Sequence, residues 1–281
     1  MLKIVKATKV KSKARVGISG PAGSGKTYSS LSIASGLGDR IVVIDTENGT
    51  SAKYANIFDF DIIQLDKFSP SLYVDAIHMA EANFYDVTII DSLTHAWSGT
   101  GGALEMVDVA ASRYSGNRFA AWRDVTPEHN KLVDAMVRCK THLIACMRSK
   151  TEYALERDES TGKSVVRKMG MAPIQREGMD YEFDIAGDIN TDHIWTITKT
   201  RCSDLDNAVI AKPGKDVANI IGAWLSDGID PVAYAERMFL AKHKCVSWED
   251  ALNRININVP RPSSIEEWDT MEILMSGSVS P

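Results

Sequence analysis

The sequence predicts an α/β fold in which a mostly parallel central sheet is covered by helices and carries an antiparallel hairpin at one edge. The first observation is that short apolar runs alternate with helical patterns along most of the chain. The second is that these runs are nearly continuous in apolar residues, as at 41–44, which is typical of parallel strands buried on both faces. The third is the turn sequence at 190–192 between two short strand-like segments, which predicts the hairpin.

The predicted elements follow the order of repeated strand–helix–strand units. The helix at 127–140 is predicted with Thr126 as its cap and Pro127 in its first turn. No helix is predicted in the Gly- and Ala-rich stretch 98–115, and residues 113–123 are expected to be mobile. A further helix is predicted at 71–83, and strands are predicted at 15–19, 40–45, 61–65, 85–92, 142–147, 181–188 and 193–199.

Length and composition limit the classes of protein to consider. With 281 residues, 44% of them hydrophobic and 25% charged, the chain has room for one large α/β domain and a small appendage. We place the core domain at 1–228, and a C-terminal helical extension with a flexible tail at 229–281. The extension contains two predicted helices, at 232–244 and 248–255, and the tail begins after Pro260.

The apolar segments and the cysteines of the sequence indicate the cellular location. The apolar runs are far too short to cross a bilayer, and the basic N-terminus has no apolar signal region. The four cysteines lack C-x-x-C spacing, so we expect a reducing cytoplasmic location and no zinc site.

Residues 20–27 form a complete G-x-x-x-x-G-K-[ST] phosphate-binding loop. Its glycines allow backbone N–H groups to converge on phosphate oxygens, Lys26 can reach the β- and γ-phosphates, and the Thr27 hydroxyl can bind Mg²⁺. A predicted strand precedes the loop and a helix follows it, so the positive end of the helix dipole faces the anion. This context disfavours a chance match in a Gly/Ser-rich turn. The predicted nucleoside triphosphate site comprises Gly20, Pro21, Ala22, Gly23, Ser24, Gly25, Lys26, Thr27 and Tyr28.

Two acidic residues that follow predicted strands are expected to complete this site. Asp91 ends a buried strand, from where a carboxylate can hold Mg²⁺ through water; the alternative is an exposed acid that merely ends a strand. Glu47 follows a neighbouring strand, from where it can orient or deprotonate an attacking water; the alternative is a chance acid in a turn.

Two segments resemble those of RecA-type recombinases. Residues 41–48, with Asp45-Thr46-Glu47, are similar to the segment after that family's first helix, in which the Glu activates water. Residues 87–93 resemble its Walker B strand. The chain most resembles the small phage-encoded RecA-core ATPases associated with single-strand annealing and recombination, over about residues 14–225.

The resemblance implies a RecA-like P-loop NTPase fold, hydrolysis of ATP with Mg²⁺ and single-stranded DNA as a partner. It also implies a homo-oligomer, ring or filament, with the nucleotide at the subunit interface, a single-strand-binding or replication protein as a further partner, and the cytoplasm of the host cell as location. A third similarity concerns Lys199 and Arg201, which resemble the K-x-R finger of RecA-fold hexameric helicases and related recombinases. Two residues apart on a strand, they are expected to point the same way and to contact the γ-phosphate of a neighbouring subunit. The alternative is a solvated basic strand end.

The sequence departs from the family in two respects. Recombinases usually place a Gln that senses the γ-phosphate after the strand matching 142–147, whereas Arg148-Ser149 stands there in this chain. Arg148 is therefore a candidate cationic sensor. The long N-terminal element that links RecA-type protomers into filaments is not recognised, so assembly through the nucleotide site is a hypothesis.

Two segments are candidates for contact with DNA. Residues 148–176 hold seven basic and four acidic side chains and occupy the position of the DNA-binding loop of RecA-like proteins. Residues 117–123 combine cations with aromatic rings, as single-strand binding usually requires. The alternatives are a solvated basic face and buried aromatic packing, since the net charge of −5 attracts no nucleic acid by itself. The candidate DNA-binding residues are Lys150, Lys163, Arg167, Lys168, Arg118 and Arg123.

Three functions are consistent with these residues. The leading one is a RecA-like ATPase that acts on single-stranded DNA in phage recombination or replication, as an annealing or strand-exchange accessory. The second is a non-catalytic, nucleotide-gated loader or switch for a replication partner. The third is a small-molecule P-loop kinase, which the position of Glu47 and the lack of an obvious Arg-rich lid disfavour.

Overall fold

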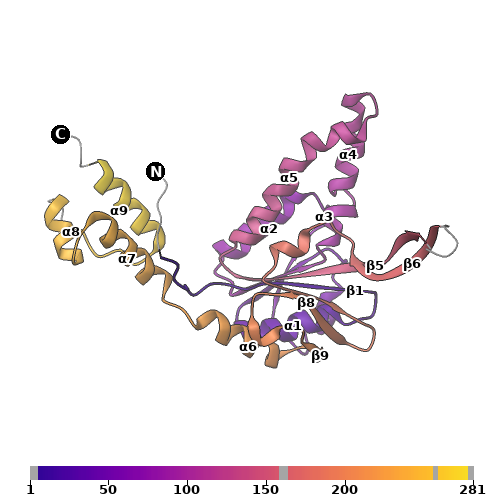
Figure 1. The fold of residues 1–281 in the computed structure, drawn as a ribbon, viewed down its shortest axis with the longest axis horizontal. Helices are drawn as coiled ribbons and strands as arrows, with labels where there is room; N and C mark the ends of the chain where they lie inside the picture. Colours follow the sequence, from indigo (N-terminus) through magenta and orange to yellow (C-terminus); the bar gives the residue numbers. More distant parts are fainter. Residues whose placement is uncertain (1–5, 158–163, 256–258, 278–281) are drawn as a thin grey trace. The chain divides into compact units, whose positions relative to one another are not determined.

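The computed structural model describes residues 6–157, 164–255 and 259–277, with only the backbone described for 151–157, 164–170, 255, 276 and 277. The described chain forms two compact units (Figure 1). The larger unit comprises residues 13–222, and the smaller one joins residues 1–12 to 223–281.

The larger unit is built on one mixed sheet. The strand order is β3-β2-β4-β5-β1-β7-β8-β9, and β6 pairs with the outer part of β5. The neighbours from β3 to β7 are parallel, whereas β7–β8, β8–β9 and β5–β6 are antiparallel. The predicted fold class, with its antiparallel edge hairpin, is therefore confirmed. The strands are β1 (Arg15–Gly20), β2 (Ile41–Asp45), β3 (Asp61–Gln64), β4 (Val87–Asp91), β5 (His142–Arg157), β6 (Ser164–Pro173), β7 (Ile185–Ile189), β8 (Ile194–Thr200) and β9 (Val209–Ala211).

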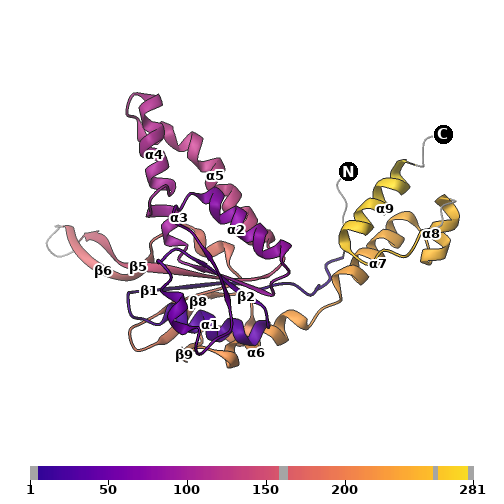
Figure 2. The ribbon, with the colours of Figure 1, turned by 180° about the vertical axis from the view of Figure 1, so that it is seen from behind.

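Helices cover the two faces of this sheet (Figures 1 and 2). On one face lies α1 (Lys26–Leu37), with the start of α6 (Lys215–Ser226) beside it. On the other face lie α2 (Pro70–Ala82) and α5 (Arg118–Arg138), whose apolar side chains pack with those of β4 and β5 in one core. Cover by helices on both faces explains why every residue of β1, β2 and β4 is buried and why most of them are apolar.

The register of the parallel strands brings the predicted site residues to one edge of the sheet. Asp45 at the end of β2 pairs with Asp91 at the end of β4, and Gly20 at the end of β1 pairs with Arg148 on β5. Ligands bind at the carboxyl ends of strands in open α/β sheets. The phosphate-binding loop and the acids that end or follow β2 and β4 therefore lie at the edge of the sheet where a ligand-binding site is expected.

The region between β4 and β5 differs from the prediction. Helix α3 (Thr94–Ser98) ends where the stretch 98–115 begins, and α4 (Ala103–Ala111) forms within that stretch, because the alanines of α4 bury against α5. Helix α5 begins at Arg118 rather than Pro127, so residues 118–123 are helical and the capping role of Thr126 is wrong. Asn117 is the actual cap, since its side chain accepts a hydrogen bond from Ala120 N at 3.1 Å.

Strand β5 continues beyond Arg148, where the prediction ended it. It pairs with β6 from Ser149 opposite Pro173 to Arg157 opposite Ser164, and this hairpin projects from the sheet (Figure 1). Pairing between the two strands satisfies the backbone groups of a polar segment that has no apolar pattern of its own.

The smaller unit is a helical bundle with a separate core. It contains α7 (Pro231–His243), α8 (Trp248–Ile255) and α9 (Ile265–Gly277), the first two as predicted. Helix α9 contradicts the prediction of a flexible tail over its residues, because Trp268, Met271 and Met275 face the bundle core at helical spacing. None of the described helices of either unit is long and apolar enough to cross a membrane.

Candidate functional site

The phosphate-binding loop joins the end of β1 to the start of α1. Gly23 and Gly25 have φ values of 77° and 87°, which only glycine adopts without strain. A side chain at Gly20 would lie 2.3 Å from the Ile189 carbonyl oxygen, so this glycine is required by close packing. Gly25 caps α1 without a side-chain hydrogen bond, so the first N–H groups of the helix have no intrahelical partner. These groups and the curled backbone fit a bound phosphate.

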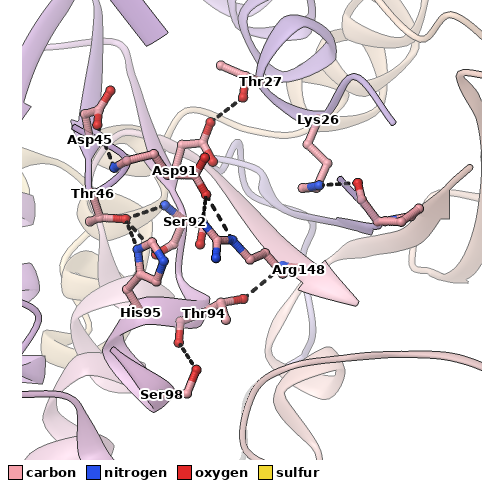
Figure 3. A network of polar contacts seen from close by, with 12 residues as sticks. Lys26, Thr27, Asp45, Thr46, Asp91, Ser92, Thr94, His95, Ser98 and Arg148 are labelled. Atoms are coloured by element: carbon pink, nitrogen blue, oxygen red, sulfur yellow. Dashed lines mark hydrogen bonds and ion pairs between the residues drawn. The ribbon is translucent and has the colours of Figure 1, made fainter. Parts of the chain in front are cut away.

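Lys26, Thr27 and Asp91 lie together beside this loop (Figure 3). The Lys26 ammonium donates to the carbonyl oxygens of Gly20 and Pro21 at 2.9 and 2.8 Å, which holds it over the loop. Thr27 Oγ1 donates to Asp91 Oδ2 at 2.5 Å. A hydroxyl and a carboxylate are oxygen ligands of the kind that Mg²⁺ prefers, and Mg²⁺ in such sites takes its other ligands from water and phosphate. The donor set therefore fits the ion.

The electrostatics of Asp91 also suit a cation. Its side chain is buried, and burial raises the pKa of its carboxyl group from 3.8 to about 6. The neighbouring carboxylates of Glu47 and Asp45 contribute to this rise in pKa, whereas the Thr27 hydrogen bond and the Lys26 charge oppose it. A divalent ion at this position would favour the ionised carboxylate. Among the described residues, no three acidic, histidine or cysteine side chains form a metal-binding group.

Glu47 is positioned by the turn that follows β2. The buried Asp45 carboxylate accepts hydrogen bonds from the backbone N–H groups of Glu47, Gly49 and Ser51, at 2.8, 3.1 and 3.3 Å, and from the Ser51 hydroxyl. One carboxylate thus fixes the path of the whole turn. The sequence contained a signal for this arrangement, an Asp shortly before Asn48-Gly49, but its structural role was not predicted.

Arg148 contacts Glu47 directly. Its Nε and Nη2 atoms donate to Glu47 Oε1 at 3.1 and 2.7 Å. Both side chains line a pocket of about 580 Å³ together with the phosphate-binding loop. The residues lining this pocket include Ala22, Gly23, Gly25, Lys26, Thr27, Glu47, Asp91, Arg148, Ser149 and Ile174.

A network of polar contacts links the ends of β2 and β4, the strands that end in Asp45 and Asp91 (Figure 3). Thr46 Oγ1 accepts from Ser92 N at 2.8 Å and lies 2.7 Å from His95 Nδ1. Burial lowers the pKa of His95, and the nearby Arg148 charge lowers it further, so its imidazole is neutral at pH 7. The network ties the residue after Asp45 to the residue after Asp91, which fixes the separation of the two strand ends.

Tyr28 lies in a second pocket of about 460 Å³ that shares Gly23 and Gly25 with the first. Its ring meets those of Tyr54 and Phe58 edge to face, with centroids 5.8 and 5.2 Å away. His193 Nδ1 lies 3.0 Å from the Ser24 carbonyl oxygen and closes the other side of this pocket. An aromatic and polar pocket of this kind, adjoining the phosphate loop, suits a nucleobase. Sequence reasoning did not find Tyr54, Phe58 or His193, because they are distant in the chain from the loop.

Lys199 and Arg201 are not part of this pocket. Lys199 pairs with Ala186, which pairs with Gly17 on β1, so it lies toward the amino end of β1, away from the phosphate-binding loop. Its ammonium donates to the Tyr181 carbonyl oxygen at 3.3 Å, and Arg201 forms an ion pair with Asp184 at 2.7 Å. Strand β8 ends at Thr200, so Arg201 lies outside it. Strand geometry therefore does not require the side chains of Lys199 and Arg201 to point the same way.

The candidate DNA-binding residues fall into two separate places. Lys150 is exposed on β5, and Arg167 and Lys168 belong to β6, where only the backbone is described; Lys163 lies outside the described residues. Arg118 opens α5 and forms an ion pair with Asp108 at 2.9 Å, while Arg123 is exposed further along that helix. Trp122, which was a candidate for stacking on bases, instead stacks on Trp97 with ring centroids 5.4 Å apart.

Comparison with known proteins adds one finding to this geometry. Residues 12–213 match a protein family described as "AAA domain", a span that contains the whole phosphate-binding pocket. Among curated proteins, no match to the chain was found.

Proposed function

This chain belongs to the AAA domain family of P-loop NTPases, and we propose that it hydrolyses ATP with Mg²⁺ and acts on single-stranded DNA in phage recombination or replication. The observation that carries the proposal is the shared pocket of Lys26, Thr27, Asp91 and Glu47. Each supplies a group that phosphoryl transfer to water requires, and they come from three different strand ends.

The roles of the residues follow from their positions. The loop N–H groups and Lys26 bind the β- and γ-phosphates and stabilise the charge that develops on them. Thr27 and Asp91 would hold Mg²⁺, which when bound would neutralise charge on the phosphate oxygens. Glu47 orients the water that attacks the γ-phosphorus and accepts its proton, and ADP leaves in line.

DNA binding is assigned to the β5–β6 hairpin. Its first strand passes through the pocket at Arg148 and Ser149, and its second strand ends just before Ile174, which also lines the pocket. A ligand that binds the hairpin is therefore connected to the ATP site through both of the chain segments that line it. Lys150 and the basic residues of β6 supply the positive charge that a phosphate backbone requires.

Assembly of several copies is part of the proposal. Lys199 and Arg201 lie outside their own pocket, so a role at a γ-phosphate requires a neighbouring subunit. The nucleotide then lies at the subunit interface, and hydrolysis depends on the oligomer.

A phosphate-release assay tests the ATPase and the partner together. ATP is supplied with Mg²⁺, with and without single-stranded DNA, to the wild-type chain, to Lys26→Ala and to the matched surface variant Lys67→Ala. We expect turnover in the wild type and in Lys67→Ala, stimulation by DNA, and no turnover in Lys26→Ala. Tight ATP binding without turnover contradicts the hydrolase and favours a nucleotide-gated switch. Turnover that single strands do not change contradicts the DNA partner alone.

A further inference from the structure

The contact between Arg148 and Glu47 joins a cation to the acid that we expect to direct water. Both hydrogen bonds from the guanidinium end on one oxygen, Oε1, at 3.1 and 2.7 Å. The two side chains remain 49% and 28% exposed. Ion pairs with this exposure contribute little to stability, so the contact can be exchanged for another at small cost.

The backbones on both sides of this contact are held in place. Arg148 N donates to Thr94 Oγ1 at 2.9 Å, and its carbonyl oxygen accepts from Ile174 N at 2.7 Å. Glu47 N donates to the buried carboxylate of Asp45 at 2.8 Å. The ion pair can therefore be made or broken by rotation of the side chains, without movement of the β5 strand or of the turn after β2.

A triphosphate competes with Glu47 for the same guanidinium. Arg148 lines the pocket that also contains Lys26 and Thr27, where the terminal phosphate is expected. Guanidinium groups bind phosphate, as they bind carboxylate, with two parallel, charge-assisted hydrogen bonds. Glu47 takes the Nε–H and one Nη2–H of the guanidinium, so a phosphate that binds through this same pair of donors displaces Glu47.

We propose that the Arg148 guanidinium moves from Glu47 to the terminal phosphate, so that Glu47 is free to direct water only when a triphosphate is bound. This inference rests on the proposed function, because it assumes the ATP site. A nucleoside diphosphate has no terminal group at that position and leaves the ion pair in place. Arg148 thereby links the availability of the acid to the presence of the phosphate to be cleaved.

A different role would be a permanent ion pair in which Arg148 only positions Glu47. That arrangement predicts a loss of kcat in Arg148→Ala, with no change in the preference for triphosphate over diphosphate. The exchange predicts a change in that preference, which is measured at equilibrium and without turnover.

The first experiment is calorimetric titration of Mg²⁺·ATPγS and Mg²⁺·ADP into wild type, Arg148→Ala and Arg113→Ala. Arg113→Ala is the matched control, since Arg113 is an exposed arginine paired with Asp124 at 3.5 Å in the same unit. In Arg148→Ala we expect ATPγS binding to weaken about tenfold and ADP binding to change less than about twofold. Equal weakening for both nucleotides, or for neither, overturns the proposal.

The second experiment separates the exchange from simple repulsion between Glu47 and phosphate. Glu47→Gln removes the competing anion, so ATPγS binding is expected to tighten by about two- to fivefold with ADP unchanged. In the double variant Glu47→Gln/Arg148→Ala this gain should disappear, because no guanidinium is left to release. Repulsion alone predicts that the gain persists or grows in the double variant, and that result overturns the exchange.

Failure of this inference is distinguishable from failure of the proposed function. If the wild type binds ATPγS and releases phosphate from ATP, and only the pattern across the variants is wrong, the exchange alone is refuted. If the wild type binds neither nucleotide while its melting curve shows a folded protein, the ATP site is refuted and the exchange with it. Melting curves of all variants identify any that fail to fold, and for these Arg148→Lys, which keeps the charge but loses the paired hydrogen bonds, replaces Arg148→Ala with the same expected loss of ATPγS preference.

Discussion

Asp91 should make the metal-free protein less stable as the pH rises. Its carboxyl pKa is raised from 3.8 to about 6 in the folded chain, mainly by burial. The folded state thus binds the proton more tightly than the unfolded state, and the stabilising contribution of the protonated form is complete below the unfolded pKa. It is lost as the pH rises through the folded pKa, and the full loss is about 3 kcal/mol, since one pKa unit corresponds to about 1.4 kcal/mol.

The substitution that isolates this contribution is Asp91→Asn, because asparagine keeps the shape and can still accept the Thr27 hydrogen bond but does not titrate. The free energy of unfolding is measured by urea denaturation of both proteins in EDTA, at about pH 4.5 and about pH 7.5. From the two pKa values, the stability of the wild type relative to Asp91→Asn should fall by about 2 kcal/mol between these pH values. Taking the difference between the two proteins cancels the titration of every other group.

An identical difference between wild type and Asp91→Asn at both pH values would show that burial does not raise this pKa. A change of the opposite sign would mean that the folded chain stabilises the ionised carboxylate even without a metal. Repeating the measurement with Mg²⁺ and ADP provides a further check, because a bound cation should remove much of the penalty at the higher pH.

Three further predictions concern the same pocket. Lys26→Ala should lower kcat for ATP at least about a hundredfold, because it removes the cation at the β- and γ-phosphates, and retained turnover would show that the loop has another role. Mixing Glu47→Gln subunits with Arg201→Ala subunits should restore phosphate release if the finger acts between chains; no recovery at any ratio counts against that arrangement. Asp45→Asn should lower the free energy of unfolding by about 1–3 kcal/mol in urea denaturation, because its amide group faces backbone donors, whereas an unchanged midpoint would show that the turn does not depend on this carboxylate.

Local patterns predicted much of the core correctly. The phosphate-binding loop, the strands ending at Asp45 and Asp91, and the β7–β8 hairpin depend on short-range signals: glycine conformations, apolar strand runs and turn residues. The start of α5 was predicted wrongly for a related reason. Pro127 is typical of a first helical turn, but packing of Ala121 and Val125 against α4 extends the helix through it, and tertiary burial outweighed the local preference.

The residues that complete the site could be identified only from the tertiary structure. His193 reaches the Ser24 carbonyl oxygen from the turn between β7 and β8, beside β1, and no sequence signal links these two positions. The Arg148–Glu47 ion pair depends equally on the strand order, which places the β5 and β2 ends around one pocket. From its position in the chain, Arg148 could be named as a cation near phosphate but not as a partner of Glu47.

By itself, the amino-acid order determined a phosphate-binding loop and acids at the ends of two further strands, because those features are specified by residue type within a few positions of a strand end. Only the tertiary structure decided which of them touch. The parallel register set Asp91 against Thr27 and Arg148 against Glu47, and it left Lys199 and Arg201 outside the pocket. The physical reason is that contacts between distant segments depend on strand order and packing, which no local pattern encodes.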